Sequence, residues 1–570
     1  MTRWPAAGGI GAAMAAGLAM WLIRLALQVR SVPERILEWS LLFVPLDVFE
    51  SALQTFGFSA KRYGLYLGIV MMLALLAWLG YIALRGAWST EAIVALGVGV
   101  WLFTMVVVMP LTSAGIFALG LLEGTRATVL GYLGVSLVYA STLTLVRSFG
   151  VPMASPSAPR LPPRRWALSM MGGSVAVLAS TYVLEMLLPH RTGLPTIVVA
   201  DPQEPVPSGG VDEPNPHPNV VASPPPSAAT VATAIPTLVA GSAEPPSPRT
   251  LPRDQDGAVL PSGRKLGELS DVLTTNDNFY IVTKNAGGDP FLHPDDWRLV
   301  VDGEVQRPFE LDYTALRKLP TVEVTKTLEC ISNLVDKCEL APFGCDLIST
   351  ARWKGVRLSD VLNLVGGVKP GAAFLATISA DEYTTALPID VAMAPDALLV
   401  FEMNGQLLPR EHGYPARLLI PGRYGLKNAK WIVALRPMRR EFVDWYGQRQ
   451  WSREAVVKTM TRIDVPAREA RLQAGVQRIA GVAYGGDRGV KYVEFSPDGG
   501  QTWQQAELAE GASERDVWVR WQGRFTIPSG TAVTLMARAT DGTGALQIQP
   551  FSLAQPDGSS GWHSITVVGA

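Results

Sequence analysis

The pattern of hydrophobic and polar positions divides this chain into three unlike parts. Roughly the first 190 of its 570 residues are strongly apolar, about seventy proline-rich residues follow, and the remainder mixes polar and apolar positions as soluble proteins do. Because single hydrophobic cores stop growing near about 250 to 300 residues, this length predicts several domains. We expect them at residues 1–189, 190–262, 263–455 and 456–570.

Five stretches of the apolar part are predicted membrane spans, because about 20 apolar residues suffice to cross the hydrocarbon core. They are residues 4–23, 63–84, 92–122, 127–146 and 166–184. Pro110 is expected to kink or end the longest of them. The stretch 33–57 is apolar but contains Glu34, Arg35, Glu38, Asp47 and Glu50. This favours a helix along the membrane surface and five spans in all, with six spans as the alternative.

The basic residues predict the orientation of the membrane part. The loop 147–165 contains four arginines and no acidic residue, which favours the cytoplasmic side. The last span then carries the chain outward, so everything after residue 190 is expected outside the cytoplasm. Lys61 and Arg62 favour the opposite orientation if there are five spans.

Residues 190–262 are predicted to be a disordered linker. Sixteen prolines lie between Pro195 and Pro261, among Ala, Ser, Thr and Val. Such a composition cannot bury a core and favours extended polyproline conformations. We therefore interpret this stretch as a tether without a binding site.

Composition also argues against two classes of partner. The formal net charge is -1, which gives no indication of a nucleic-acid partner. The five histidines are residues 190, 217, 293, 412 and 563, so none lies in a predicted span. A bis-histidine haem in the membrane is thereby excluded, and no CxxCH motif occurs for covalent haem attachment. No haem is expected in this chain.

The third part contains mixed helix and strand patterns and then strands alone. "WRLVVDGEV" (297–305) alternates like a strand, and "LSDVLNLVGG" (358–367) is typical of a capped helix ending at glycine. The Asn-Gly pair in "ALLVFEMNGQLLP" (397–409) predicts a hairpin. Residues 263–455 are therefore predicted to be an α+β domain. After Thr461, short alternating segments with Asp-Gly turns predict a β-sandwich.

Six motifs occur in order along these two domains. They are "NFYIVTKN" (278–285), "TLECISN" (327–333), "STARWKGVRLSDVL" (349–362), "SADEYTTALP" (379–388), "MNGQLLPREHGYPARLLIPGRYGLKNAKWI" (403–432) and "VEFSPDGGQTW" (493–503). Together they resemble the sulfite oxidase family of molybdenum enzymes. The resemblance implies a molybdopterin-binding domain followed by an immunoglobulin-like domain, through which two chains would pair.

The resemblance suggests roles for the three cysteines. Cys330 in "TLECISN" would be the thiolate ligand of molybdenum, since soft sulfur suits a transition metal bound by a dithiolene. A buried, inert cysteine is the alternative. Cys338 and Cys345 lie seven positions apart, and in an oxidising compartment a disulfide is favoured over two free thiols near the metal.

The family motifs also imply a set of cofactor-binding residues. By similarity they are Asn278, Tyr280, Asn333, Ser379, His412, Arg417, Asn428, Ala429 and Lys430. Arg417 and Lys430 would add positive charge, while Asn428 and Ala429 offer backbone N–H groups. Tyr383 matches the tyrosine that relatives place beside the metal's oxygen ligand, with a strand aromatic facing the core as the alternative.

Two departures from the family pattern concern the substrate. Lys284 stands where sulfite oxidases use an arginine to hold the anion, and it keeps the charge without the bidentate fork. Leu334 stands where the Cys-x-x-Asn-Arg pattern has its arginine. A dianion such as sulfite requires several fixed cations, so both departures weaken the case for sulfite itself.

The sequence thus predicts a membrane-anchored molybdenum-pterin oxidoreductase that transfers oxygen atoms to or from a small molecule outside the cytoplasm. An S- or N-oxide reductase, and a non-enzymatic, membrane-tethered Ig-like binding protein, are the alternatives. Tyr383 and the C-terminal sandwich favour the oxidase. Besides membrane lipid, a separate cytochrome or quinone is the expected electron-transfer partner.

Export is a further requirement of this interpretation, because molybdopterin is inserted in the cytoplasm and the protein must cross the membrane folded. Arg164 and Arg165 directly precede the last predicted span. They resemble an internal twin-arginine signal that remains as an anchor. A loop that merely follows the positive-inside rule is the alternative.

Overall fold

The structure is a computed structural model in which the chain forms two compact units. It describes residues 3–41, 43–44, 52, 55–56, 59–121, 125–150, 164–187, 197–199, 220–222, 259–509 and 514–570. The first unit, here called the helical unit, comprises Met1–Ala52, Ser59–Arg191 and Lys284–Gly288. The second, here called the β unit, comprises Leu53–Phe58, Thr192–Thr283 and Asp289–Ala570.

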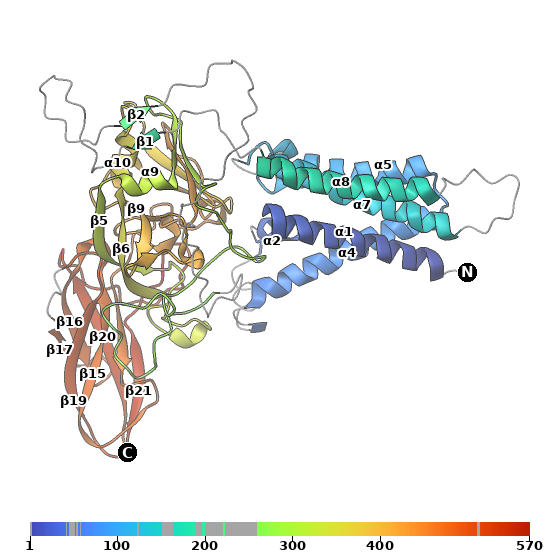
Figure 1. The fold of residues 1–570 in the computed structure, drawn as a ribbon. Helices are drawn as coiled ribbons and strands as arrows, with labels where there is room; N and C mark the ends of the chain where they lie inside the picture. Colours follow the sequence, from blue (N-terminus) through green and yellow to red (C-terminus); the bar gives the residue numbers. More distant parts are fainter. Residues whose placement is uncertain are drawn as a thin grey trace, which may run out of the picture. The chain divides into compact units, whose positions relative to one another are not determined.

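Long apolar helices make up the helical unit (Figure 1). They are α1 (Arg3–Leu27), α4 (Ala60–Arg85), α5 (Thr90–Phe103), α7 (Thr125–Gly150) and α8 (Arg164–Leu187). Among the described residues, four helices are long and apolar enough to cross a membrane: Trp4–Leu27, Ala60–Arg85, Thr90–Leu111 and Thr125–Phe149. They coincide with four of the predicted spans. The fifth predicted span falls in α8, where the apolar helix Leu168–Leu184 is shorter.

The third of these helices changes its winding before it ends. After α5 the chain continues through the π-helical turn η2 (Thr104–Val108) into α6 (Met109–Leu111). Pro110 cannot donate a backbone hydrogen bond, and the helix stops one residue after it. The predicted effect of Pro110 is confirmed.

Glycines let the apolar helices approach closely. A Cβ on Gly9 of α1 would lie 2.4 Å from the carbonyl oxygen of Ala77 in α4. A Cβ on Gly97 of α5 would lie 2.8 Å from the Ala140 Cβ in α7. Small residues at such crossings allow backbone-to-backbone packing of the kind common between membrane helices.

The charged stretch 33–57 begins with a short helix, α2 (Val32–Ser40). Ser31 and Glu34 form a capping box at its start, which satisfies the first backbone donors. At about 1.5 Å per residue the helix is far too short to span the membrane. Residues 45–51 lie outside the described part of the chain.

Two sheets form the first part of the β unit. The described residues place β4 (Phe309–Asp312), β3 (Arg298–Val301), β12 (Ile432–Met438), β7 (Phe374–Ser379) and β8 (Thr384–Pro388) in one sheet, in that order. The other sheet has the order β10 (Gln406–Leu407), β9 (Leu398–Met403), β6 (Ile348–Arg357) and β5 (Thr321–Glu329), with β11 (Arg417–Leu419) also paired to β9. The helices between them are short: α9 (Tyr313–Lys318), α10 (Leu358–Asn363) and α11 (Ile389–Ala392). The region is richer in strands than the sequence pattern indicates.

The local predictions in this region can be checked one by one. The strand in "WRLVVDGEV" is β3. The Asn-Gly turn connects β9 and β10, with positive φ values of 52° at Asn404 and 75° at Gly405, as a hairpin of this kind requires. The helix in "LSDVLNLVGG" is α10, but its N-cap residue Arg357 makes no side-chain capping bond. The prediction of a capped helix was therefore wrong at its first turn, because an arginine side chain has no acceptor atom for the backbone N–H groups.

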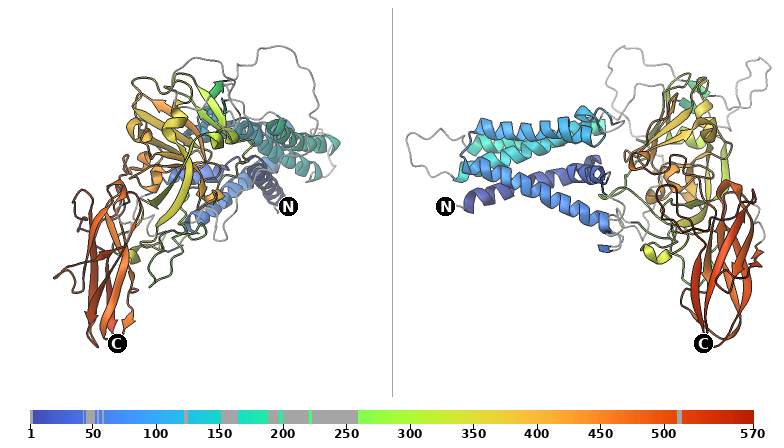
Figure 2. Two further views of the ribbon diagram at one scale, coloured as in Figure 1. Left: turned by 60° about the vertical axis from the view of Figure 1, so that its left-hand side comes forward. Right: turned by 180° about the vertical axis from the view of Figure 1, so that it is seen from behind.

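Two further sheets form the C-terminal part of the β unit and face each other in both views of Figure 2. In the described residues one has the order β13 (Met460–Val465), β15 (Gly475–Tyr484), β19 (Val519–Ile527) and β18 (Glu507–Leu508). The other has the order β14 (Arg471–Leu472), β21 (Ser564–Gly569), β20 (Ala532–Asp541), β16 (Val490–Ser496) and β17 (Gln504–Gln505). Trp521 and Phe525 from the first pack in one core with Phe495 and Leu535 from the second.

Most of the proline-rich stretch lies outside the described residues. Within it, β1 (Ile197–Val199) pairs antiparallel with β2 (Val220–Ala222). The chain is described again from residue 259, and Leu260 forms a bridge with Ile281. The linker therefore stays a prediction.

Candidate active site around Cys330

Cys330 lies where β5 ends, and its backbone is held on both sides. Its N–H donates to the Leu347 carbonyl at 2.9 Å, and its carbonyl accepts from the Asn333 N–H at 2.9 Å. The Asn333 side chain donates to Glu329 Oε1 and accepts from the Leu347 N–H, each at 2.9 Å. Asn333, which the motif placed in the cofactor-binding set, thus holds together the loop that carries the buried Cys330 thiol.

Three tyrosines, here called the aromatic wall, lie close enough to Cys330 to interact electrostatically with it. Burial raises the pKa of Tyr280, Tyr383 and Tyr446, and negative charge at Cys330 raises each further. All three phenols therefore stay protonated at any physiological pH. The rings of Tyr383 and Tyr446 lie 5.9 Å apart, and Tyr383 Oη donates to the Leu426 carbonyl at 2.6 Å.

A buried ion pair supports this aromatic wall. Lys427 Nζ lies 2.7 Å from Asp444 Oδ2 and donates to the Ala386 carbonyl at 3.0 Å. Asp444 also accepts hydrogen bonds from the Ala386 N–H, the Thr385 hydroxyl and the Gly447 N–H. Burial lowers the pKa of Lys427, while the charge of Asp444 opposes that shift. Sequence reasoning missed both residues, although Lys427 lies inside a quoted motif.

Arg449 brings a further positive charge to the same wall. Its guanidinium lies over the Trp445 ring, and Trp445 and Tyr446 both pack against Tyr383. Burial lowers the Arg449 pKa to about 10, and the coupled phenols of Tyr446 and Tyr383 oppose this shift. The side chain remains charged at neutral pH. The segment "DWYGQR" carries no recognisable motif, so the sequence alone offered no signal for it.

Arg417 and Ser379 present buried polar atoms without partners among the described residues. Arg417 donates to the carbonyls of His412 at 3.0 Å and Asn428 at 2.9 Å, but its Nε has no hydrogen-bond partner. The Ser379 hydroxyl at the end of β7 is likewise buried and unpartnered. Buried polar groups in folded proteins normally find partners, so these two atoms fit a polar ligand such as the pterin cofactor.

Other members of the predicted cofactor set hold the backbone nearby. Asn428 accepts from the Ile420 N–H and donates to the carbonyls of Arg423 and Tyr424. His412 is buried, with its Nε2 at 3.3 Å from the Asn276 carbonyl. These side chains hold the segments before and after β11, the strand in which Arg417 lies. Their predicted contact with the cofactor is not tested by these bonds.

The last three members differ in exposure. Lys430 is half-buried, donates to the Glu411 carbonyl at 2.8 Å and lies over the Trp431 ring. Ala429 is buried and its carbonyl accepts from the Leu418 N–H at 2.8 Å. Asn278, by contrast, is exposed.

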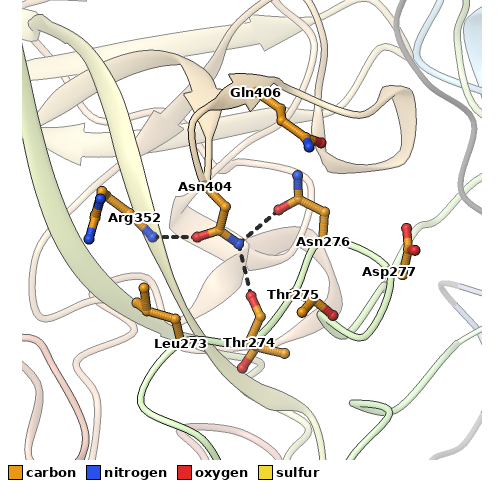
Figure 3. A pocket seen from close by; sticks show the side chains of 8 residues that line it. All are labelled: Leu273, Thr274, Thr275, Asn276, Asp277, Arg352, Asn404 and Gln406. Atoms are coloured by element: carbon orange, nitrogen blue, oxygen red, sulfur yellow. Dashed lines mark hydrogen bonds between the residues drawn. The ribbon is translucent and has the colours of Figure 1, made fainter.

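A pocket of about 330 Å³ lies around the Asn-Gly turn (Figure 3). Its lining residues are Leu273, Thr274, Thr275, Asn276, Asp277, Arg352, Asn404 and Gln406. The Asn404 amide donates to the Thr274 carbonyl and to Asn276 Oδ1, each at 2.9 Å, and its oxygen accepts from the Arg352 N–H. The Asn276 carbonyl also contacts His412. Asn276 therefore links the Asn-Gly turn at this pocket to His412 of the predicted cofactor-binding set.

Lys284, the predicted anion-binding residue, belongs to the helical unit together with residues 285–288. Within that unit its Nζ lies 3.2 Å from Glu38 Oε2, and both side chains are almost fully buried. The other predicted site residues belong to the β unit. A role of Lys284 in binding substrate stays a prediction.

The segment after Cys330 contains the second departure, Leu334, and the two remaining cysteines. Leu334 is buried, so an apolar side chain occupies the position of the family's arginine. Cys338 and Cys345 form a disulfide, as the sequence favoured. The disulfide closes a loop after Cys330, whose base is the hydrogen bond from the Leu334 N–H to the Gly344 carbonyl at 3.4 Å.

Comparison with known families matches the two parts of the β unit separately. Residues 286–446 match the model of the oxidoreductase molybdopterin binding domain. Residues 453–561 match the model of the Mo-co oxidoreductase dimerisation domain. The two matches are contiguous apart from a few residues and include Cys330, Tyr383 and Arg417.

Individual relatives agree with these models. The chain is 32% identical to the mitochondrial sulfite oxidase of Homo sapiens over 339 residues, which are 52% of this chain and 61% of the human protein. It is 31% identical to the sulfite oxidase of Gallus gallus over 328 residues, 50% of this chain and 69% of that protein. The solved sulfane dehydrogenase SoxCD of Paracoccus pantotrophus is 22% identical, with a TM-score of 0.48, over 60% of this chain and 94% of that one. The chain thus spans about three fifths of the human sulfite oxidase and about two thirds of the chicken one, and it belongs to the sulfite oxidase family of molybdopterin oxidoreductases.

Proposed function

We propose that this protein is a membrane-anchored molybdenum-pterin oxidoreductase of the sulfite oxidase type, with Cys330 as the metal ligand. The single observation that carries the proposal is the pair of orphaned buried atoms, Arg417 Nε and Ser379 Oγ, in the same unit as the buried Cys330 thiol. A fold without a ligand would leave these groups unsatisfied, at a cost of about 1 to 3 kcal/mol each. A cofactor with polar ring and phosphate groups satisfies them.

The chain's own residues have distinct tasks in this proposal. Asn333 fixes the loop that carries Cys330, and Arg417 and Ser379 hold and orient the pterin. When bound, the cofactor's molybdenum supplies a two-electron redox centre that exchanges an oxygen atom with the substrate. Tyr383 keeps a proton on Oη at all working pH values, because its pKa is raised by burial and by neighbouring negative groups. That proton is available for a hydrogen bond to substrate instead of the Leu426 carbonyl.

The substrate is proposed to be a small oxyanion or a related sulfur compound. Arg449 lies at the aromatic wall and is positively charged at neutral pH. It would supply the positive charge that the family's arginine provides at the position occupied here by Leu334. Sulfite therefore remains the first substrate to test. The C-terminal domain of the dimerisation type and the phenol of Tyr383 support oxidation over reduction of S- or N-oxides. Family membership speaks against a non-enzymatic display module.

The location of the site is proposed from the sequence pattern. The helical unit anchors the protein with five spans, counting the stretch 166–184, and the β unit lies outside the cytoplasm. Arg164 and Arg165, where α8 begins, act as an internal twin-arginine signal. The two C-terminal sheets form an immunoglobulin-like sandwich through which two chains pair. A cytochrome or a membrane quinone exchanges electrons with the site.

Metal analysis tests the proposal directly. Full-length protein from a host that makes molybdopterin should contain about one molybdenum per chain. Cys330→Ser should remove the sulfur ligand, which X-ray absorption at the molybdenum edge detects. Absence of molybdenum from the folded, unmodified chain overturns the proposal.

Activity assays then decide the direction of the reaction. Sulfite with an artificial electron acceptor tests the oxidase, and reduced dye with sulfoxides or N-oxides tests the reductase. Activity in the first assay, lost in Cys330→Ser, is the expected result. Activity in the second assay alone would assign the protein to the reductases.

A further inference from the structure

The Cys338–Cys345 disulfide is asymmetric in a way that a purely structural crosslink does not require. Cys338 is half-buried, whereas Cys345 is buried with 2% of its surface exposed. Arg462 Nη1 donates to the Cys345 carbonyl at 2.8 Å and holds this side of the loop against the C-terminal domain. Cys338 is thus the more accessible residue of the pair, and Cys345 is the more firmly held.

A buried histidine directs an N–H group at the sulfur of Cys338. His563 Nε2 lies 3.2 Å from Cys338 Sγ. Its other nitrogen, Nδ1, accepts a hydrogen bond from the Ile463 N–H at 3.1 Å, so a neutral ring must carry its proton on Nε2. A disulfide sulfur is a weak acceptor that gains little from this donor, whereas a thiolate gains much more from it.

The hydrogen bond of this imidazole is with Cys338. A ring nitrogen of His563 and the two sulfur atoms all lie within 4.8 Å of one another, and the contact at 3.2 Å is with Cys338 Sγ. The ring is held by the Ile463 hydrogen bond and is 95% buried. Its N–H group is therefore placed to stabilise a thiolate at Cys338.

The loop keeps its base without the disulfide. The Leu334 N–H donates to the Gly344 carbonyl, and the Asn333 side chain joins Glu329 to Leu347. Opening of the disulfide therefore leaves the loop attached at its base, and Cys330 keeps its backbone hydrogen bonds. This is what a reversible dithiol–disulfide couple needs.

From this geometry we propose that Cys338 and Cys345 form a redox-active couple that exchanges with an external dithiol, with Cys338 as the sulfur that forms the mixed disulfide and Cys345 as the leaving group. The assignment follows from access: the less buried cysteine forms the mixed disulfide and the buried one is released from it. It is independent of the molybdenum chemistry proposed above.

The exchange is balanced in two steps. A thiolate of the external dithiol attacks Cys338 Sγ, a new S–S bond forms, and the Cys338–Cys345 bond breaks with its electron pair going to Cys345, which takes up a proton. The second thiolate of the same molecule then attacks its own first sulfur and releases Cys338 as a thiolate beside His563 Nε2–H. The external dithiol is oxidised by two electrons, and the protein disulfide is reduced to two thiols.

The first test uses the unmodified full-length protein with dithiothreitol as the dithiol. Under native conditions the disulfide should be reduced while circular dichroism and intrinsic fluorescence remain unchanged. Alkylation followed by peptide mass spectrometry should show modification of Cys338 about tenfold or more faster than of Cys345, because access controls thiol reactivity. Reduction only after unfolding, or equal alkylation of the two cysteines, would overturn the proposal.

Substitution of His563 separates its chemical role from a packing role. His563→Asn retains an acceptor for the Ile463 N–H but removes the donor at the position of Nε2, and it should slow alkylation of reduced Cys338 about threefold to tenfold. His563→Gln places an amide donor near that position and should restore part of the rate. His293→Gln, on an exposed histidine of the same unit, is the matched control. Equal rates in all four proteins would contradict the role of His563.

Single-cysteine variants locate the mixed disulfide. Cys345→Ser should capture glutathione from glutathione disulfide at Cys338, whereas Cys338→Ser should capture it at Cys345 about tenfold or more slowly, because that thiol is buried. Faster capture at Cys345 would reverse the proposed roles. If either variant fails to fold, the dithiothreitol experiment on the unmodified chain decides.

Discussion

The guanidinium carbon of Arg449 lies 3.4 Å from the centroid of the Trp445 ring, and Arg449 Nη1 donates to the Trp445 carbonyl at 2.7 Å. These contacts fix a permanent cation beside Tyr446 and Tyr383, which both interact electrostatically with Cys330. Stacking on an aromatic face orients a guanidinium and keeps its positive charge in place. Arg449 is therefore the residue of this wall that is best suited to attract an oxyanion.

Replacing Arg449 with methionine should weaken binding of an anionic substrate. A hydrogen bond to a charged group contributes about 1.5 to 3 kcal/mol, so the KM for sulfite should rise about tenfold or more. The kcat should change less, because the cofactor-binding residues are untouched. Steady-state assays with an artificial acceptor measure both constants.

Arg453→Met is the matched control for this change. Arg453 is an exposed arginine four residues along the chain that pairs with Glu441. It should leave KM unchanged. A normal KM in Arg449→Met, with molybdenum retained, would show that the anion is bound elsewhere.

The features that the sequence predicted well are those encoded over a few residues. The Asn404-Gly405 turn needs only two residues that tolerate positive φ, and Pro110, which cannot donate a backbone hydrogen bond, lies one residue before the end of its helix. The strand alternation of "WRLVVDGEV" likewise predicted β3 from its own residues. In each case the chemistry and the structure lie in the same short segment.

The features that the sequence did not predict depend on contacts between distant segments. His563 contacts Cys338 although the two residues are 225 positions apart. Asp444 pairs with Lys427 across 17 positions, and neither residue lies in a strand. No periodic pattern in the sequence encodes such pairs. Which side chains become buried, and which of them contact each other, is determined only when the sheets pack together. The exposure of Asn278 and the burial of Leu334 have the same origin.

Removing the orphaned hydroxyl of Ser379 should separate cofactor binding from stability. Ser379→Ala deletes a buried polar atom without a partner among the described residues, so the cofactor-free protein should keep or gain stability, by up to about 1 to 3 kcal/mol. Retention of the pterin should fall, because one of its proposed partners is lost. Thermal unfolding of cofactor-free protein and the molybdenum content of fully loaded preparations measure the two effects.

Thr377→Val provides a comparison on the same strand. Its hydroxyl is also buried and has no partner among the described residues, but no family motif assigns it to the cofactor. Stability should respond as in Ser379→Ala, while the molybdenum content should stay normal. Equal molybdenum contents in both variants would remove Ser379 from the cofactor site.

Breaking the buried pair of Lys427 and Asp444 should destabilise the β unit strongly. Asp444→Asn leaves the Lys427 ammonium buried without its counter-charge, and losing one partner of a buried pair costs about 3 to 5 kcal/mol. Trp445 fluorescence during denaturant unfolding reports on this region. Glu441→Gln breaks an exposed pair instead and should cost less than about 1 kcal/mol. Similar losses in the two variants would mean that the Lys427–Asp444 pair is hydrated in solution.

The stability of the protein should depend on His563 in mildly acidic solution. Burial, together with the charges of Arg462 and Arg264, lowers the His563 pKa to about 3, although Asp464 and Asp346 act in the opposite direction. An unfolded histidine has a pKa of about 6.5, so between these values the unfolded chain binds a proton that the folded chain does not. Stability is therefore complete above about pH 6.5 and is lost as the pH falls toward 3.

His563→Gln removes the group that binds this proton in the unfolded chain. The unmodified protein should lose up to about 1.4 kcal/mol of stability per pH unit below pH 6.5 relative to the variant. Denaturant unfolding at pH 7 and at pH 4.5 measures the difference, and comparison of the two proteins cancels the contribution of all other titrating groups. Parallel curves would mean that folded His563 accepts a proton. Its Nδ1 would then no longer accept from the Ile463 N–H, and the assignment of the Nε2 proton toward Cys338 would have to be abandoned with it.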